Sequence, residues 1–261
     1  MSEKVSSESF VDHNEKLVLV TGSSGQIGSD ISRKYLAHGA TVIGLDLQEP
    51  NELLGIEKRF HHQRMDVTNS DEVNSVFASL TKKYGLFDVL INNAGVASFD
   101  SFWDRRDSDL SLMVDVNLKG TFNCIRAFAK NSNEMNSNRS IVNVGSVYGI
   151  VSPDFRVYGE GDRRSPEMYG ATKAGVIQMS RYFAVALSKE KIRVNSVSPG
   201  GIYNPDNPQS SSFIDEYISR VPLSRMGNSI EIANAIIYLT SESASYITGH
   251  NLVVDGGYSA I

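Results

Sequence analysis

The chain has 261 residues, of which 41% are hydrophobic and 21% charged, a composition typical of a folded globular protein and not of a disordered or fibrous one. Its 25 Lys and Arg residues against 30 Asp and Glu residues give a net charge of −5, which argues against binding to nucleic acid. The single cysteine, Cys124, cannot form an internal disulfide, and this fits a cytoplasmic protein.

The N-terminal residues 1–14 are polar and aperiodic, so we expect a flexible tail rather than a signal peptide. A continuous apolar run at residues 17–20 is then typical of a strand buried on both faces. A turn rich in glycine and serine follows, and apolar residues recur at helical spacing from Ile27 to Leu36. No apolar run approaches the roughly 18 to 20 residues of a membrane helix, so we expect no membrane association.

The same alternation of apolar strands and amphipathic helices continues to the C-terminus. Further strands are expected at residues 41–45, just before residues 65–66, and at 88–91, 140–145, 192–198 and 252–254. Helices are expected at residues 71–84, 110–130, 168–188 and 230–240. This order predicts one α/β domain over residues 15–261, with a doubly wound parallel sheet of about seven strands and helices on both faces.

A glycine-rich turn lies between the first strand and the first helix, where a dinucleotide pyrophosphate can meet free backbone N–H groups and the positive end of a helix dipole. Gly22 permits the tight turn, Gly25 lets the backbone approach a phosphate, and Gly28 lets helix and strand pack closely. This pattern indicates a Rossmann fold, although a purely structural glycine turn is the alternative. We assign five turn residues to cofactor binding: Gly22, Ser24, Gln26, Ile27 and Gly28.

Two aspartates follow later strands of the predicted sheet. Asp46 ends the second strand, where a carboxylate accepts hydrogen bonds from the adenosine ribose hydroxyls and repels a 2′-phosphate, so we predict NAD rather than NADP as the cofactor. The alternative is a helix-capping or turn aspartate. Asp66, with Val67 beside it, lies at the carboxyl end of the third strand and either reaches the adenine edge or caps the next turn.

Tyr169 and Lys173 open a predicted helix four residues apart, which places the phenol and the ammonium on one face. A fixed cation nearby stabilises phenolate, so we expect Lys173 to lower the pKa of Tyr169 toward the working pH. Such a phenol can take a proton from an alcohol or return one to a carbonyl. Ser146 ends the strand before and could hold the substrate oxygen against the phenol, or serve only as a cap.

Several motifs in a fixed order resemble the short-chain dehydrogenase/reductase family over residues 15–261. They are the turn at 21–28, Asn92-Asn-Ala-Gly95, Asn117 within residues 116–120, Ser146 after residues 141–145, Tyr169 with Lys173, the segment 193–200, and Asp255-Gly-Gly257.

The resemblance implies roles for individual residues. Tyr169 would be the acid and base, Lys173 would hydrogen-bond the nicotinamide ribose, Ser146 would position the substrate oxygen, and Asn117 would hold a water in a proton relay. The remaining residues would border the cofactor: Asn93, Ala94, Gly95, Pro199, Gly200 and Ile202. The resemblance also implies a homo-oligomer, with a tetramer favoured and the helices at 110–130 and 168–188 forming one contact. We assign no metal ligand.

The chain departs from the family pattern in three places. Its glycine spacing resembles the longer, sugar-nucleotide-using branch of the family. Ser146 and Tyr169 are 23 residues apart, and the extra residues form a loop insertion at 150–166 that is rich in Gly, Pro and charge. Asn204 stands where a Thr often reaches the nicotinamide carboxamide, and residues 204–228 form a predicted mobile substrate lid.

We expect the loop insertion to be solvated or to contact another subunit, and the alternative is that its three arginines hold an anion: Arg156, Arg163 and Arg164. The insertion also resembles family members of bacterial surface-sugar and flagellin-glycan pathways, which would make the small-molecule substrate a sugar or sugar derivative.

We therefore predict an NAD-dependent enzyme that interconverts a secondary alcohol and a ketone by hydride transfer. One alternative is an NADPH-linked carbonyl or 3-oxoacyl-carrier reductase, against which Asp46 argues. Another alternative is a non-catalytic nucleotide-sensing scaffold that binds a protein partner. The complete set of Ser146, Tyr169 and Lys173 argues against the scaffold.

Overall fold

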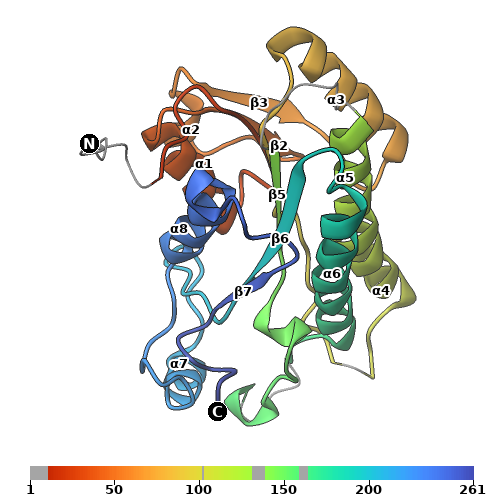
Figure 1. The fold of residues 1–261 in the computed structure, drawn as a ribbon. Helices are drawn as coiled ribbons and strands as arrows, with labels where there is room; N and C mark the ends of the chain where they lie inside the picture. Colours follow the sequence, from red (N-terminus) through yellow and green to blue (C-terminus); the bar gives the residue numbers. More distant parts are fainter. Residues whose placement is uncertain (1–10, 102, 131–138, 159–163) are drawn as a thin grey trace, which may run out of the picture.

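One parallel sheet forms the centre of the protein (Figure 1). The computed structural model describes residues 11–101, 103–130, 139–158 and 164–261, and in these residues seven strands pair in the order β3-β2-β1-β4-β5-β6-β7. The strands are β1 (Leu17–Thr21), β2 (Thr41–Asp46), β3 (Phe60–Arg64), β4 (Val89–Asn92), β5 (Arg139–Val144), β6 (Ile192–Pro199) and β7 (Asn251–Val254). Each predicted strand is confirmed to within about two residues of its predicted ends.

The strand order reverses direction between β1 and β4, which pair in parallel with Thr21 opposite Asn92. The connections leave these two strands toward opposite sides of the sheet, so the loops that follow them separate at their carboxyl ends. A doubly wound sheet binds ligands in the crevice that opens at this point.

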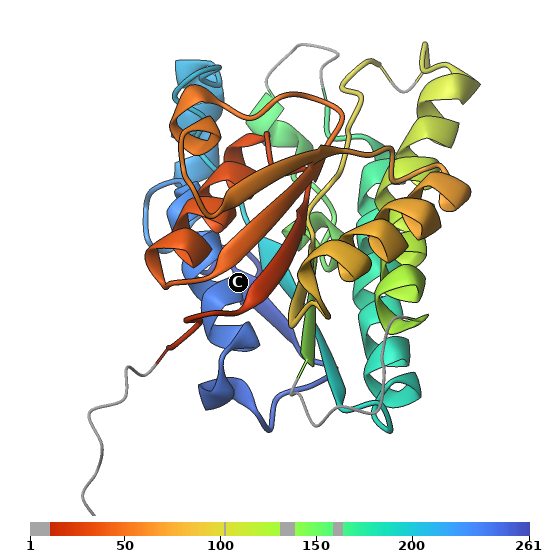
Figure 2. The same cartoon turned by 90° about the horizontal axis from the view of Figure 1, so that it is seen from above.

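Helices cover both faces of the sheet, as the sequence predicts (Figure 2). One face carries α1 (Gln26–Ala37) and α8 (Ser229–Thr240), while the other carries α3 (Ser70–Tyr84), α5 (Thr121–Lys130) and α6 (Glu167–Ala186). Alternate residues of β1 serve the two cores, because Val18 and Val20 pack toward the first layer and Leu19 toward the second. Both faces of the strand are therefore buried, which accounts for its continuous apolar run.

The predicted helix over residues 110–130 consists of three consecutive segments. These are α4 (Asp107–Met113), a π-helical stretch at Val114–Gly120, and α5. The π-helical stretch contains Asn117, which the structure buries, and such a bulge inside a helix is frequent at functional sites.

The remaining short helices are α2 (Glu52–Gly55), α7 (Ser211–Ile218), and single turns at Val147–Gly149, Phe155–Tyr158 and Glu242–Ala244. α7 lies within the predicted lid, and the turn at Phe155–Tyr158 lies within the loop insertion. No helix of the described residues has both the length and the apolar character to cross a membrane.

The prediction of a flexible tail through residue 14 is wrong for its last four residues. His13 is only 1% exposed, its Nε2 lies 3.1 Å from the carbonyl oxygen of Ile237 in α8, and Val11 packs against the same core. Burial of this ring lowers the pKa of His13, because the protonated form loses its hydration. Residues 1–10 lie outside the described residues.

Candidate active site

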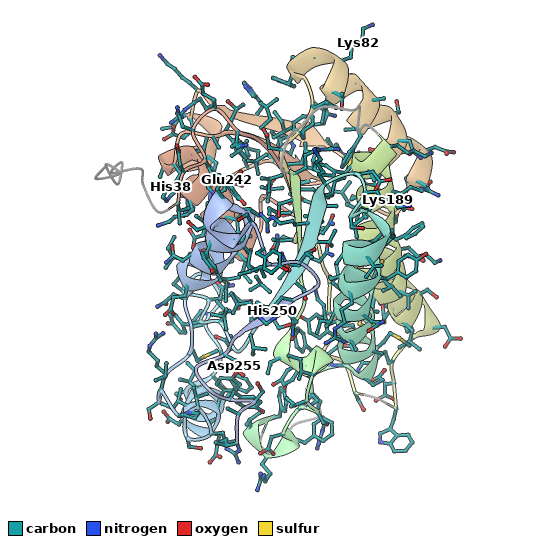
Figure 3. All side chains as sticks on the ribbon, in the orientation of Figure 1. His38, Lys82, Lys189, Glu242, His250 and Asp255 are labelled. Carbon is teal, nitrogen blue, oxygen red and sulfur yellow. The ribbon has the colours of Figure 1, made fainter. Side chains whose placement is uncertain are left out.

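The candidate site is a cleft of about 830 Å³ at the carboxyl ends of the strands. Asp255, just after β7, marks this end of the molecule, whereas Lys82 in the last turn of α3 and Lys189 beyond α6 lie toward the opposite end (Figure 3). Of the residues predicted to bind cofactor or substrate, the following line the cleft: Gly22, Gln26, Ile27, Asp46, Asp66, Val67, Asn93, Ala94, Gly95, Ser146, Tyr169, Lys173, Pro199, Gly200 and Ile202.

Two glycines of the turn after β1 occupy positions that no other residue fits. Gly22 has a φ of +65°, and a Cβ there would lie 2.8 Å from the Cα of Ala94. Gly28 does not line the cleft, and a Cβ on it would lie 2.0 Å from the carbonyl oxygen of Gly22. The turn is thus packed against β4 on one side and α1 on the other, which leaves the N-terminus of α1 open toward the cleft.

The carboxylate of Asp46 organises the loop after β2. Its Oδ2 accepts a hydrogen bond of 2.9 Å from the backbone N–H of Ser24, and its Oδ1 accepts one of 3.0 Å from that of Gln48. The Ser24 hydroxyl donates to the carbonyl oxygen of Gln48 rather than lining the cleft. Asp46 therefore joins the glycine turn to the next loop and still borders the cleft.

Ser146, Tyr169 and Lys173 meet in the same cleft although they come from different elements. Ser146 follows β5, accepts a 3.2 Å hydrogen bond from the backbone N–H of Tyr148, and hydrogen-bonds the Tyr169 phenol. Lys173 is one turn along α6, with its Nζ 5.7 Å from the centroid of the Tyr169 ring. The predicted placement of phenol and ammonium on one face of a helix is confirmed.

The expected lowering of the Tyr169 pKa by Lys173 is wrong for this structure. Burial raises the pKa of Tyr169, and the hydrogen bond from Ser146 offsets only part of that rise. The Lys173 ammonium donates instead to the carbonyl oxygen of Val144 at 2.7 Å, and burial lowers the pKa of Lys173 to about 8. The tertiary structure has given the cation a backbone partner that the helical spacing could not reveal.

Asn117 does not line the cleft but holds Val96, which does. Its side-chain oxygen accepts from the backbone N–H of Val96 at 2.8 Å, and its amide nitrogen donates to the Val96 carbonyl at 3.0 Å and to Thr172 Oγ1 at 3.2 Å. These bonds use both amide hydrogens and one lone pair of the amide oxygen, and they tie the loop after β4 to α6. A Cβ on Gly95 would lie 3.4 Å from both Asn117 Oδ1 and Lys173 Nζ.

Part of the cleft has aromatic walls that the sequence pattern does not predict. They come from the turn after Ser146, the loop insertion and the lid, and comprise Tyr148, Tyr158, Phe213 and Tyr217. Rings from the two predicted segments meet, since the Tyr158 and Phe213 centroids are 5.4 Å apart. Aromatic residues at scattered positions give no periodic signal, so only the fold brings them together.

The loop insertion binds the lid through charge as well as through rings. Asp154 Oδ2 lies 2.7 Å from Arg220 Nε, at the end of the lid helix, and 2.6 Å from Arg156 Nη2. Arg156 is thereby committed to Asp154, and its side chain is 80% exposed and outside the cleft. Arg164 stacks 5.1 Å from the Phe155 ring centroid, and Arg163 lies outside the described residues. Arg156 therefore fits the expected solvated loop rather than the alternative of an anion site.

Asn204 does not line the cleft either. Its Oδ1 accepts from the backbone N–H of Asp206 at 3.1 Å, inside its own loop. Gln26 of the glycine turn instead reaches this region, because its Nε2 donates to the carbonyl oxygen of Tyr203 at 2.6 Å. The start of the lid is thus attached to the phosphate-binding turn.

Between about pH 8 and pH 10, the wild-type protein should gain stability relative to a Lys173→Met variant. Folding lowers the pKa of Lys173 from 10.5 to about 8, so in this range the unfolded chain holds a proton that the folded protein has released. Stability rises with pH wherever the unfolded state binds more protons, and the gain should be on the order of 3 kcal/mol.

Guanidinium unfolding of both proteins at pH 7.5 and pH 10 measures this difference, and the variant cancels the contribution of the tyrosines. Identical pH dependences of the two unfolding free energies would contradict the lowered pKa.

Comparison with known proteins places this geometry in context. A family model described as Enoyl-(Acyl carrier protein) reductase matches residues 22–259. The chain is 35% identical over 249 residues to the 3-oxoacyl-[acyl-carrier-protein] reductase FabG of Thermotoga maritima, a match that covers 93% of this chain and 97% of that protein.

Two solved structures are also similar. A short chain dehydrogenase from Leptospira borgpetersenii with bound NAD+ is 41% identical, with a TM-score of 0.88 over 95% of this chain and 94% of that one. The aldohexose dehydrogenase AldT of Thermoplasma acidophilum, solved in ligand-free form, is 29% identical, with a TM-score of 0.79 over 95% of each chain.

Proposed function

The chain belongs to the short-chain dehydrogenase/reductase family of oxidoreductases, which act on CH–OH and carbonyl groups, and we propose that it uses NAD to interconvert a secondary alcohol and a ketone. The observation that carries this proposal is the phenol of Tyr169, which lines the cleft, hydrogen-bonds the Ser146 hydroxyl and has the buried Lys173 one helical turn away. These are the groups that proton transfer at an alcohol oxygen requires.

The residues of the cleft fit a dinucleotide. The turn at Gly22 and the N-terminus of α1 present backbone N–H groups that suit a pyrophosphate. A Cβ at Gly22 would clash with the backbone of the loop that follows β4. The Asp46 carboxylate would accept hydrogen bonds from the ribose hydroxyls and would repel a 2′-phosphate, which supports NAD over NADP. Asp66 and Val67 would border the adenine, and Asn93 to Gly95 and Pro199 to Ile202 would flank the rest.

The protein's own side chains would accept and donate the proton of the reaction. In the oxidation direction the substrate hydroxyl donates its proton to Tyr169 Oη while Ser146 Oγ holds the substrate oxygen. Bound NAD+ supplies the hydride acceptor and a positive charge beside the phenol, which favours phenolate. By the family resemblance, Lys173 would hydrogen-bond the nicotinamide ribose. Asn117 keeps Val96 and Thr172 in place and, by the same resemblance, would hold the water of a proton relay.

For the substrate we propose a sugar or sugar derivative, with surface-glycan precursors as a narrower form of the proposal. The aromatic walls of Tyr158 and Phe213 suit the apolar face of a sugar ring, and the AldT relative is named for an aldohexose substrate. The likeness to FabG favours a second candidate, the reduction of a 3-oxoacyl group on a carrier. The single buried cysteine further supports a cytoplasmic location.

A direct assay separates these candidates. Reduction of NAD+ and of NADP+ is followed by absorbance with a panel of hexoses, sugar phosphates and nucleotide sugars, and oxidation of NADH and NADPH with a 3-oxoacyl thioester. The proposal expects turnover with NAD+ and at least one sugar. Turnover confined to NADPH and the thioester would establish the second candidate instead.

We further propose a homo-oligomer, with a tetramer favoured, in which α5 and α6 form one contact between subunits. Three large side chains on these helices are exposed in the single chain, and we call them the α5–α6 face: Phe122, Tyr182 and Val185. Phe122 and Tyr182 both contact the ring of Phe183, which joins these two side chains of the face across the two helices. Contiguous apolar surface of this kind marks a protein interface.

A Val185→Arg variant should therefore form a smaller oligomer than the wild type. Val185 is 77% exposed, so the arginine costs the single chain little, but at a subunit contact it would bury an unpaired charge. Light scattering during size-exclusion chromatography measures the mass, with Ile56→Arg as the control because Ile56 is equally exposed but lies beside α2. Identical masses for all three proteins would remove the α5–α6 face from the contact.

A further inference from the structure

The side chain of Gln209, in the lid segment just before α7, lines the cleft and carries an unsatisfied hydrogen-bond acceptor. Its amide nitrogen donates to the carbonyl oxygen of Ile202 at 3.1 Å. Its amide oxygen is shielded from solvent and has no hydrogen-bond partner among the described residues. Gln209 thus presents one half of its amide to the protein and leaves the other half unused.

The orientation of this amide follows from its partner. A carbonyl oxygen can only accept a hydrogen bond, so the amide group must turn its nitrogen toward Ile202 and its oxygen away. Rotating the amide by half a turn would place two acceptors against each other. The Ile202 carbonyl therefore fixes Gln209 as an acceptor toward whatever lies on its other side.

An unpaired buried acceptor costs about 1–3 kcal/mol, and folded proteins satisfy nearly all such groups. The neighbours of Gln209 in the cleft indicate what would satisfy it. Ile202 is predicted to border the cofactor, and Ser210, together with Phe213 of the aromatic walls, lines the same cleft. Gln209 therefore lies between a residue assigned to the cofactor and the aromatic walls, where cofactor and substrate would meet.

We propose that Gln209 is a ligand-binding residue whose amide oxygen accepts a hydrogen bond from an N–H or O–H group of a molecule bound at this end of the cleft. The inference rests on the proposed function, which supplies two such donors: the carboxamide N–H of the nicotinamide and a hydroxyl of the substrate. Gln209 would then be the lid residue that contacts the ligand. Asn204 would not, because its side-chain oxygen is engaged within its own loop.

A Gln209→Met variant tests this inference because methionine keeps the length of the side chain and removes the acceptor. Without ligand, its thermal midpoint should stay close to that of the wild type, because the variant removes the unpaired amide oxygen but also loses the hydrogen bond to the Ile202 carbonyl oxygen. The affinity of the variant for the molecule whose N–H or O–H group pairs with Gln209 should be about five- to thirtyfold lower than that of the wild type. The control is Asn207→Met, an exposed position in the same segment that does not line the cleft, which should change neither quantity.

Two comparisons identify the donor. Dissociation constants are measured for NAD+ and for its 3-acetylpyridine analogue, which carries a ketone in place of the carboxamide and so has no N–H group. Turnover is measured for the best alcohol of the substrate panel and for its deoxy counterparts. A loss confined to NAD+ assigns the donor to the carboxamide, and a loss confined to the hydroxylated substrate assigns it to the substrate, and either result supports the proposal.

Equal effects of Gln209→Met on NAD+ and its analogue, together with equal effects on each substrate and its deoxy form, would overturn it. If no alcohol is turned over, the dinucleotide comparison alone decides. Failure of the wild-type protein to bind any dinucleotide would overturn the proposed function and this inference with it, whereas normal NAD+ binding without discrimination at Gln209 overturns the inference alone.

Discussion

A Tyr169→Phe variant should bind NADH as the wild type does and should lose turnover by about 10²- to 10⁴-fold, the contribution typical of a positioned acid and base. The substitution removes a single oxygen that lines the cleft and hydrogen-bonds Ser146. The ring that packs near Lys173 stays in place, so the fold and the cofactor cleft should be preserved. Fluorescence titration with NADH and steady-state turnover measure the two quantities separately.

Tyr182→Phe provides the matched control for this substitution. Tyr182 is on the same helix, α6, but its side chain is exposed on the surface away from the cleft. The control should keep wild-type turnover. Unchanged turnover in Tyr169→Phe would mean that another group moves the proton, and an absence of turnover in the wild type with every alcohol and carbonyl compound would favour the nucleotide-sensing scaffold.

An Asp46→Asn variant should bind NADH about 10- to 100-fold more weakly and NADPH more tightly than the wild type. A carboxylate has two strong acceptor oxygens, and those of Asp46 hold the backbone N–H groups of Ser24 and Gln48. An asparagine has only one acceptor, so it loses charge-assisted bonds worth about 1.5–3 kcal/mol and no longer repels a 2′-phosphate. Titrations with both reduced dinucleotides at one ionic strength measure the change.

Asp71→Asn is the control, because Asp71 is an exposed aspartate in the first turn of α3 and does not line the cleft. It removes the same charge without touching the loop after β2, and the ratio of NADH to NADPH affinity should stay at the wild-type value. A wild-type preference for NADPH would overturn the assignment of NAD and would strengthen the carrier-linked reductase candidate.

The architecture and many residues of the cleft could be predicted from the sequence. Strands such as β1 are buried on both faces and must be apolar throughout, while α3 shows its apolar stripe at helical spacing, so both leave a local signal in the chain. The glycine turn, Asp46 and the pair of Tyr169 and Lys173 also act through short spacings. Because the carboxyl ends of parallel strands meet at one edge, knowing the elements was enough to gather these residues.

Contacts between distant segments could not be predicted from the sequence and emerge with the fold. The fold docks His13 onto α8, directs the Lys173 ammonium to Val144, and pairs Asp154 of the loop insertion with Arg220 of the lid. It also leaves the amide oxygen of Gln209 without a partner beside the cleft. The physical reason is the separation along the sequence at which contacts form. Helical and strand periods reflect neighbours a few residues apart, whereas the partner of a buried polar group depends on how separate elements pack and cannot be inferred from local spacing.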